Sequence, residues 1–249
     1  TNMNKTLTSN KDLTVAIVGT GNVATHLMKA LGGKCRLIRI LPRTPEDIPS
    51  STDIALIAVK DDAINEVADK IAGKAGIVAH TSGSVPMSAL AGAAGHTGVF
   101  YPLQTFSKGV ELNYSEIPVF IEGDCTHTVE SLSALAGLFS DNVIEADSSQ
   151  RKQLHLASVF ACNFSNRLAG IADMILRDAG MDYKVLLPLL RQTISKLETL
   201  SPDEAQTGPA AREDMNVINS HLDMLKEKPR LQRIYSDITN EIISTHNNH

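Results

Sequence analysis

A glycine-rich corner near the start of the chain holds the first residues that could bind a cofactor. Gly19, Gly21 and Ala24 form the pattern G-x-G-x-x-A directly after the apolar run of residues 14–18. In dinucleotide-binding domains the first glycine permits a tight turn, and the second lets the backbone approach a pyrophosphate. A helix from about residue 22 would point its N-terminal amides at the phosphates; a glycine turn without a ligand is the alternative. The expected dinucleotide contacts are Gly19, Thr20, Gly21, Asn22 and Val23.

The end of the second predicted strand, residues 35–41, indicates which dinucleotide fits. Sites that prefer NAD usually place Asp or Glu there to bind the ribose hydroxyls. This chain continues instead with Pro42, Arg43 and Thr44. A guanidinium binds phosphate in a forked geometry, which suits the 2′-phosphate of NADP. We therefore expect Arg43 and Thr44 to favour NADP over NAD, unless Arg43 is only a solvated loop residue.

Two further polar corners follow the next two predicted strands. The strand at residues 53–59 ends where a doubly wound sheet borders its cofactor cleft. The strand at residues 76–80 runs into the sequence Thr-Ser-Gly-Ser, whose hydroxyls and amides could bind a carboxylate or phosphate. A helix N-cap formed by Ser84 is the alternative role. The residues expected at the cofactor are Val59, Lys60 and Asp61, and those expected at the substrate are Thr81, Ser82, Gly83, Ser84 and Gln104.

His155 and Asn163 are the candidate catalytic residues of a long predicted helix, residues 148–180. Their spacing of eight places them within about 80° of each other around the helix. A histidine in a cleft can donate or accept a proton near neutral pH, so His155 is the candidate proton donor. A core histidine bonded to a backbone carbonyl is the competing interpretation, which spacing alone favours. Negative charge developing on the substrate would face Ser82, Ser84 or Asn163.

These candidates require an α/β frame that is followed by helices. About seven short strands alternate with helices across residues 13–147, a pattern typical of a doubly wound Rossmann domain. Strand-like runs then stop, which predicts a dinucleotide-binding domain at 1–147 and an all-helical domain at 148–249. The centre of the long helix, residues 154–176, is apolar on most faces, so we expect it to be buried in a core or against a partner chain. Further helices are expected at 182–200, 213–227 and 230–244.

The composition narrows the function classes. The chain has 249 residues, of which 43% are hydrophobic and 20% charged, which is ordinary for a soluble globular protein. A net charge of −5, 4% aromatic residues and no Trp argue against a nucleic-acid partner. No apolar run reaches 18 residues, so no membrane association is expected. The three separated cysteines predict neither a disulfide framework nor a metal site, and they suit a cytoplasmic location.

Several motifs together make the chain similar to a known family. They are GTGNVATHL, AVKDDAI, HTSGSVP, YPLQTFSK, HLASVFACNFSN and TGPAARED, and they span residues 19–214. On these motifs the chain resembles a bacterial family of NADP oxidoreductases that pair a Rossmann-like domain with a helical domain of unknown function. More broadly it resembles pyrroline-5-carboxylate reductase and the β-hydroxyacid, 6-phosphogluconate and prephenate dehydrogenases. The resemblance implies a homodimer paired through the helical domains and a substrate cleft between the two domains.

The chain departs from one relative in a position that matters for catalysis. β-Hydroxyacid dehydrogenases carry a catalytic Lys four residues before an Asn on the central helix, whereas Val159 precedes Asn163 here. That mechanism does not transfer, which leaves His155 as the proton donor. We expect an oxidoreductase that transfers a hydride between NADP(H) and a small polar C=O or C=N substrate. The alternative is an NADP-binding sensory or scaffolding protein without turnover, and a deazaflavin could be a further electron partner.

Overall fold

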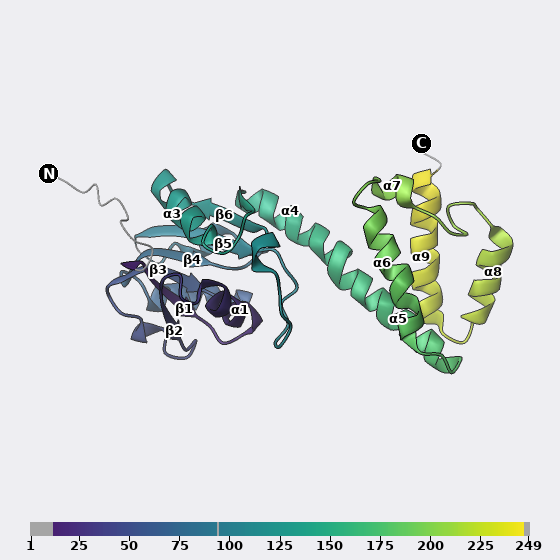
Figure 1. The fold of residues 1–249 in the computed structure, drawn as a ribbon, viewed down its shortest axis with the longest axis horizontal. Helices are drawn as coiled ribbons and strands as arrows, with labels where there is room; N and C mark the ends of the chain where they lie inside the picture. The colour runs from purple at the N-terminus through teal and green to yellow at the C-terminus, as the bar shows by residue number, and fades with distance from the viewer. Residues whose placement is uncertain (1–11, 94, 247–249) are drawn as a thin grey trace. The chain divides into compact units, whose positions relative to one another are not determined.

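The computed structural model describes residues 12–93 and 95–246 (Figure 1). Contacts divide the chain into two compact units, Thr1–Arg167 and Leu168–His249, here called the sheet unit and the helical unit. Strands give way to helices at Ser148, where the sequence predicted the change. The division between the two units lies further along, inside the long helix, so the first part of that helix belongs to the sheet unit.

The sheet unit is built on seven strands within the described residues, as the sequence predicted. Their order is β2-β1-β3-β4-β5-β6-β7. The strands β1 to β5 run parallel, whereas β6 is antiparallel to β5 and parallel to β7. Because β2 and β3 flank β1 on opposite sides, the order in which strands are added to the sheet reverses at β1, and ligands of doubly wound sheets bind at such a point. The strands are β1 Thr14–Val18, β2 Arg36–Ile40, β3 Thr52–Ile57, β4 Ala75–His80, β5 His96–Pro102, β6 Val119–Gly123 and β7 Val143–Glu145.

Helices cover both faces of the sheet, because alternate residues of its central strands are buried on opposite sides. Val15 and Ile17 pack with α1 (Asn22–Leu31) and α3 (Thr126–Ala136) in one core cluster. Ala16 packs in a second cluster with α2 (Ile64–Lys70). Strands of this kind read as continuous apolar runs. Short 3₁₀ turns complete the unit: η2 Pro45–Asp47, η3 Asp61–Ala63, η4 Met87–Leu90 and η5 Tyr114–Glu116.

The long helix consists of three consecutive segments, α4 Ser148–Ser158, the π-helical η6 Val159–Phe164 and α5 Ser165–Asp178. Its N-cap is Asp147, not Ser148 or Ser149 as the sequence suggested. The Asp147 carboxylate accepts from the Gln150 amide at 2.8 Å, and the Gln150 side chain accepts from the Asp147 amide at 3.0 Å. This reciprocal capping box satisfies two free amides, which a serine N-cap alone would not do.

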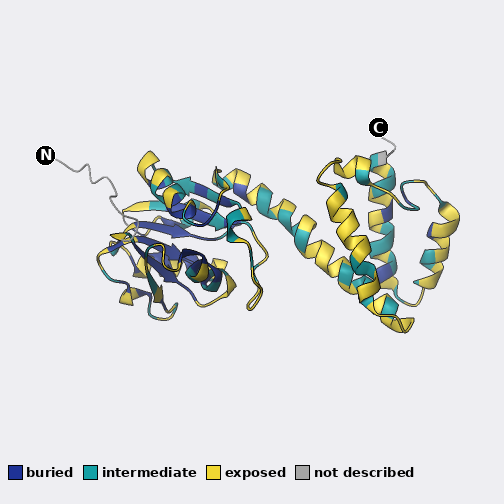
Figure 2. Cartoon of the chain, in the orientation of Figure 1, coloured by how far each residue is buried: buried dark blue, intermediate teal, exposed yellow. Residues whose placement is uncertain are grey.

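The helical unit leaves much of its apolar surface exposed in the single chain, as Figure 2 shows by its mixture of teal and yellow. The prediction that residues 154–176 are buried on all sides is not met within one chain, since Phe160, in the sheet unit, is 63% exposed and Leu168, in the helical unit, is 41% exposed. Burial against a partner chain remains the prediction. The other helices of this part of the chain are η7 Tyr183–Leu186, α6 Leu187–Lys196, α7 Pro202–Ala205, α8 Met215–Met224 and α9 Pro229–His246; α7 was not foreseen.

Candidate functional site

The glycine-rich corner after β1 is shaped by contacts that exclude side chains. A Cβ atom on Gly19 would lie 2.2 Å from the carbonyl oxygen of Ala58, so only glycine fits there. The Gly19 amide donates to the Ile40 carbonyl at 3.1 Å, which ties the corner to the end of β2. Ala24 is fully buried, and its Cβ would lie 3.1 Å from the added atom. The small residue at this third position therefore lets α1 pack closely on β1.

Gly21 differs from Gly19, because a Cβ atom on Gly21 would meet nothing within 4 Å. The protein itself does not require glycine at this position. Gly21 is also the N-cap of α1, and no side chain caps this helix end, whose first turn carries no acidic residue. The positive end of the helix dipole is thus left open for an anion.

A cavity of about 590 Å³ lies in front of this helix end. Among the residues expected at the cofactor, seven line it: Thr20, Gly21, Asn22, Val23, Val59, Lys60 and Asp61. Thr81 and Ser82, which were expected at the substrate, line it too. Gly19, Arg43 and Thr44 do not line the cavity, although Pro42 does. Arg43 is exposed and makes no hydrogen bond or ion pair with the described residues, so its guanidinium is available to a ligand.

The hydroxyl corner at residues 81–84 is joined to the cofactor corner by direct contacts. The Ser84 hydroxyl donates to the Asp61 carboxylate at 2.5 Å. The Ser82 hydroxyl accepts from the amides of Ser84 and Val85, both at 3.1 Å. Ser82 and Ser84 are therefore held in place by the backbone, and the two hydroxyl oxygens lie 3.3 Å apart.

His155 lies against this corner, where it forms a pair with Tyr101. The Tyr101 hydroxyl lies 3.2 Å from His155 Nδ1. A Cβ atom on Gly83 would lie 2.7 Å from both side chains, so glycine makes room for the pair. Burial raises the pKa of the Tyr101 phenol, and the Ser158 hydrogen bond and the Arg151 charge offset this only in part. Sequence reasoning missed Tyr101 as a site residue, although a polar aromatic near the end of a predicted strand was a usable signal.

Among the described residues, no hydrogen bond joins Asn163 or Gln104 to the His155–Tyr101 pair. Asn163 is exposed, and the Gln104 side chain accepts a hydrogen bond from the Thr105 amide at 2.7 Å in an exposed loop. Between His155 and Asn163 the helix widens into the π-helical segment η6. A π turn holds more residues than an α turn. The angle around the helix axis between His155 and Asn163 is therefore smaller than the value of about 80° expected for a regular α-helix.

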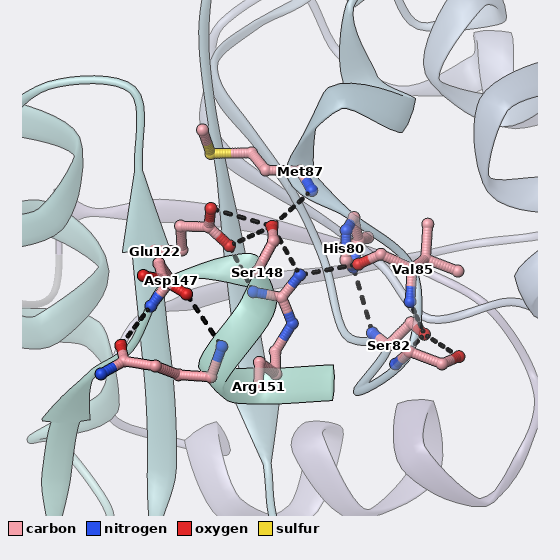
Figure 3. Close-up of polar contacts among 10 residues, drawn as sticks. His80, Ser82, Val85, Met87, Glu122, Asp147, Ser148 and Arg151 are labelled. Carbon is pink, nitrogen blue, oxygen red and sulfur yellow. Dashed lines mark hydrogen bonds and ion pairs between the residues drawn. The ribbon is translucent and has the colours of Figure 1, made fainter. Parts of the chain in front are cut away.

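A buried ion pair fixes the hydroxyl corner to the start of α4 (Figure 3). The Arg151 side chain is 1% exposed and pairs with the Glu122 carboxylate. Its Nη2 also donates to the Val85 carbonyl at 2.6 Å. Ser148 donates to both Glu122 oxygens, at 2.8 and 2.9 Å, and accepts from the Met87 amide at 3.1 Å. Sequence reasoning missed this group, because nothing in the spacing of Glu122 and Arg151 shows that β6 and α4 meet.

His80, at the end of β4, is the buried member of the same region. Its Nδ1 accepts from the Ser82 amide at 3.2 Å, and its Nε2 has no hydrogen bond of ordinary geometry within the described residues. Burial lowers the pKa of His80 to about 4, and the Arg151 charge adds to this. The Pro86 carbonyl, Asp61 and Glu122 act in the opposite direction but do not reverse the shift. His80 is therefore neutral at physiological pH.

The loop of residues 103–113 rests on α1 beside the cavity. The Asn22 side chain donates to the Phe106 carbonyl at 2.9 Å. His26 is buried on α1, and its two ring nitrogens lie 2.9 Å from the Ser107 carbonyl and from the Tyr114 hydroxyl. Asn22 was expected at the cofactor; its side chain holds this loop, while its backbone amide stays at the open helix end.

Within residues 12–93 and 95–246, no helix combines the length and the apolar composition that a membrane span needs. Comparison with known proteins matches residues 117–242 to the family described as "Domain of unknown function (DUF2520)". No protein of curated function matches the chain. A solved structure from Bacteroides fragilis, described as "putative NADP oxidoreductase BF3122", is 37% identical. The match covers 95% of this chain and 100% of that one, with a TM-score of 0.89.

Two more distant structures share the fold alone. An imine reductase from Streptomyces aurantiacus is 11% identical over 94% of this chain and 95% of its own, with a TM-score of 0.64. The pyrroline carboxylate reductase of Plasmodium falciparum, solved with NADP bound, is 9% identical over 95% of this chain and 99% of its own, with a TM-score of 0.60. With the family match and the Bacteroides relative together, the chain belongs to the family of proteins that contain the domain of unknown function DUF2520.

Proposed function

We propose that the chain is an NADP-dependent oxidoreductase that transfers a hydride between NADP(H) and the carbon of a C=O or C=N bond in a small polar substrate. The observation that carries this proposal is the cavity of about 590 Å³, which the uncapped start of α1 and the hydroxyl corner both line. A phosphate-binding helix end and groups suited to a polar substrate thus share one space. The oxidoreductase description of the Bacteroides fragilis relative supports the same class.

The residues at this cavity fit a dinucleotide. Gly19 has no room for a side chain, and Gly21 needs to be glycine only if a ligand approaches its backbone. NADPH, when bound, would supply the hydride with its electron pair. The exposed guanidinium of Arg43, next to Pro42 at the cavity wall, would bind the 2′-phosphate. The distant Plasmodium falciparum relative is a protein of the same fold that binds NADP.

His155 would supply the proton that the reduction consumes. When the hydride adds to the substrate carbon, the π electrons move to the oxygen or nitrogen, which then takes up one proton. Because Nδ1 of His155 is engaged by Tyr101, Nε2 of the protonated ring is the nitrogen left to donate. The imidazole ends the step neutral, and Tyr101 keeps it oriented. The hydroxyl of Ser82 would face the negative charge that develops on the substrate.

The cavity lining favours a small substrate that carries a carboxylate. Lys60 supplies a cation and Ser82 a hydroxyl among the lining residues. Both groups bind carboxylates through hydrogen bonds, and the bond from a charged donor is the stronger. We therefore propose keto acids and carboxylated imines as the first classes to examine.

The direct test is the oxidation of NADPH by the purified protein with keto acids, imines and oximes. His155→Ala is expected to lower kcat by about 10²–10⁴, the usual contribution of one general acid. The dissociation constant of NADPH should stay almost unchanged, because the phosphates would be held at the α1 helix end, whereas His155 lies against Gly83 of the hydroxyl corner. Tyr101→Phe should cost less, since it only orients the ring.

The matched control is His221→Ala in the helical unit. His221 forms the same kind of pair with Tyr235, with Nδ1 2.9 Å from the hydroxyl. Its loss is expected to leave kcat unchanged. Full turnover by His155→Ala would return His155 to a packing role. Tight NADPH binding without oxidation by any substrate class would instead support a sensory or scaffolding protein.

Arg43→Ala tests the choice of dinucleotide. A charge-assisted hydrogen bond contributes about 1.5–3 kcal/mol. The variant should therefore bind NADPH about tenfold or more weakly and bind NADH almost as before, which titration calorimetry would measure. Arg39→Ala is the control, because Arg39 lies on β2 and its guanidinium contacts the Thr25 hydroxyl at 3.4 Å. Equal affinity of the wild type for the two dinucleotides would contradict this role of Arg43.

A further inference from the structure

A second group of chemically active side chains lies away from the cavity, where β5 and α3 begin. His96 is the first residue of β5, and Asp124 and Cys125 connect β6 to α3. One ligand-forming atom from each residue lies within 4.8 Å of the other two. The spacing of residues along the chain predicted no metal site, because His96 is far from Asp124 and Cys125 in the sequence. The antiparallel pairing of β5 with β6 brings them together.

Two distances in this group are close to the edges of a tetrahedral metal site. His96 Nδ1 lies 3.3 Å from Asp124 Oδ2 and 3.5 Å from Cys125 Sγ. Zinc binds nitrogen at roughly 2.0–2.1 Å, carboxylate oxygen at roughly 2.0–2.2 Å and thiolate sulfur at roughly 2.3 Å. Tetrahedral angles then place a nitrogen about 3.3 Å from an oxygen and about 3.5 Å from a sulfur. Two of the three separations are therefore near those of a zinc site, and the atoms of Asp124 and Cys125 lie within 4.8 Å of each other.

The Asp124 carboxylate is also oriented for this task by its surroundings. Its Oδ1 accepts from the hydroxyl of the fully buried Thr128 at 2.6 Å, which leaves Oδ2 directed to His96. The Asp124 amide donates to the Thr97 carbonyl at 3.0 Å. Hydrogen bonds of this kind fix the ligands of metal sites in place. The Thr128 hydroxyl thus orients the Asp124 carboxylate, as the outer-sphere partners of metal-bound carboxylates do.

We propose that His96, Asp124 and Cys125 bind one zinc ion. A set of one imidazole, one carboxylate and one thiolate suits zinc better than calcium or magnesium, which take oxygen ligands. The ring of His127 stands 5.7 Å from that of His96, measured between centroids, but it is not one of the three residues whose ligand atoms lie together, and it would have to move to reach the ion. The same side chains without a metal would form only a surface hydrogen-bond network.

This site is separate from the chemistry of the nucleotide cavity. His96 pairs with Ile77 near the start of β4, whereas His80, at the carboxyl end of β4 beside the hydroxyl corner, pairs with Val99. None of the three ligand residues lines the cavity in front of α1. The ion would therefore hold the start of α3 to the start of β5 and take no part in hydride transfer.

The test is a metal titration of the full-length protein after treatment with a chelator. Cobalt(II) should bind one to one and produce a thiolate-to-metal absorption band, and zinc should displace it. Cys125→Ser is expected to abolish the band and to weaken zinc binding by more than about 100-fold, because a residue that binds the metal directly is lost. Thr128→Val should weaken binding by about 10–100-fold, the usual effect of removing an outer-sphere partner.

Cys162→Ser is the matched control, since Cys162 is another partly buried free cysteine. It should leave both the band and the zinc affinity unchanged. Circular dichroism would establish that each variant is folded, and zinc should raise the Tm of the wild type but not that of Cys125→Ser. Equal zinc affinity of the wild type and Cys125→Ser, or no thiolate band with cobalt, would overturn the proposal and leave a hydrogen-bond network alone.

Discussion

The sheet unit and the helical unit differ in how completely each buries its own apolar side chains. Among the described residues, nearly all the buried hydrophobic ones precede the long helix, and Ala210, Ile218 and Leu231 are the exceptions beyond it. The large exposed hydrophobic residues of the same described ranges show the opposite distribution, since only Leu41, Val110 and Ile144 precede the helix. The sheet unit therefore completes its core within one chain, apart from Leu156, Phe160 and Phe164 on the long helix, whereas the helical unit does not.

The exposed apolar residues of the helical unit indicate a surface that binds another molecule. Exposed apolar patches of this extent are rare on monomeric proteins and mark surfaces that bind something. The exposed residues Leu190 and Ile194 of α6 and its C-cap residue Leu197 are spaced as one helical stripe. We propose that a second copy of the chain covers this surface, in line with the homodimer expected from the sequence. The sheet unit, in contrast, relies on internal polar links such as the Arg151–Glu122 pair.

The largest effect is expected from charges placed on the α6 stripe. Leu190→Asp together with Ile194→Asp would bury unpaired carboxylates in the proposed interface, each at a cost of about 3–5 kcal/mol. Light scattering at micromolar concentration should give twice the chain mass for the wild type and the single mass for the variant. Val110→Asp in the sheet unit, also at an exposed apolar residue, is the control and should not change the mass. A monomeric wild type would remove the need for a partner.

The next effect concerns the buried ion pair of the sheet unit. Arg151→Ala leaves the Glu122 carboxylate without its partner, and breaking a buried pair costs about 3–5 kcal/mol. Urea unfolding should show this loss in the free energy of unfolding. Arg177→Ala provides the comparison from the helical unit, because Arg177 pairs with Asp173 but is 75% exposed. Exposed pairs contribute little, so similar losses for the two variants would contradict the contrast between the units.

The smallest effect is a dependence of stability on pH through His80. Its folded pKa of about 4 lies below the ordinary value of 6.5, so between these values the unfolded chain binds more protons than the folded one. The contribution of neutral His80 to the free energy of unfolding is fully present above about pH 6.5. It is lost progressively toward pH 4, by up to about 3 kcal/mol. His80→Gln keeps an acceptor for the Ser82 amide but does not titrate. Its free energy of unfolding should fall less than that of the wild type over this range, and parallel curves would argue against the shift.

The sequence could predict the parts of the fold that follow from local pattern. The apolar run at β1 and the two glycines that follow it specify a strand, a turn and a helix, because each step is a property of neighbouring residues. The change at Ser148 was visible for the same reason. The N-cap at Asp147 was missed because two serines followed it, and the use of Ser148 by Glu122 depends on contacts far along the chain.

The candidate site could be predicted only where one segment supplies it. The corners at Gly21, Asp61 and Ser82 each follow a strand, and parallel strands bring their carboxyl ends together. The pairing of Tyr101 with His155 and of Arg151 with Glu122 joins elements whose contact no local pattern reveals. Asn163 was chosen from its angle to His155 around the helix, but a separation of eight residues also corresponds to about 12 Å along a regular α-helix.

The hydrogen bonds of His26 also make the loop on α1 observable by spectroscopy. The Ser107 carbonyl can only accept, so Nε2 of His26 must carry a hydrogen, and in the neutral ring Nδ1 accepts from Tyr114. One tautomer is therefore selected for as long as the loop stays docked. Release of the loop would allow the ring to populate both tautomers. The nitrogen-15 resonances of this single imidazole would then follow the loop during a nucleotide titration, without any label on the ligand.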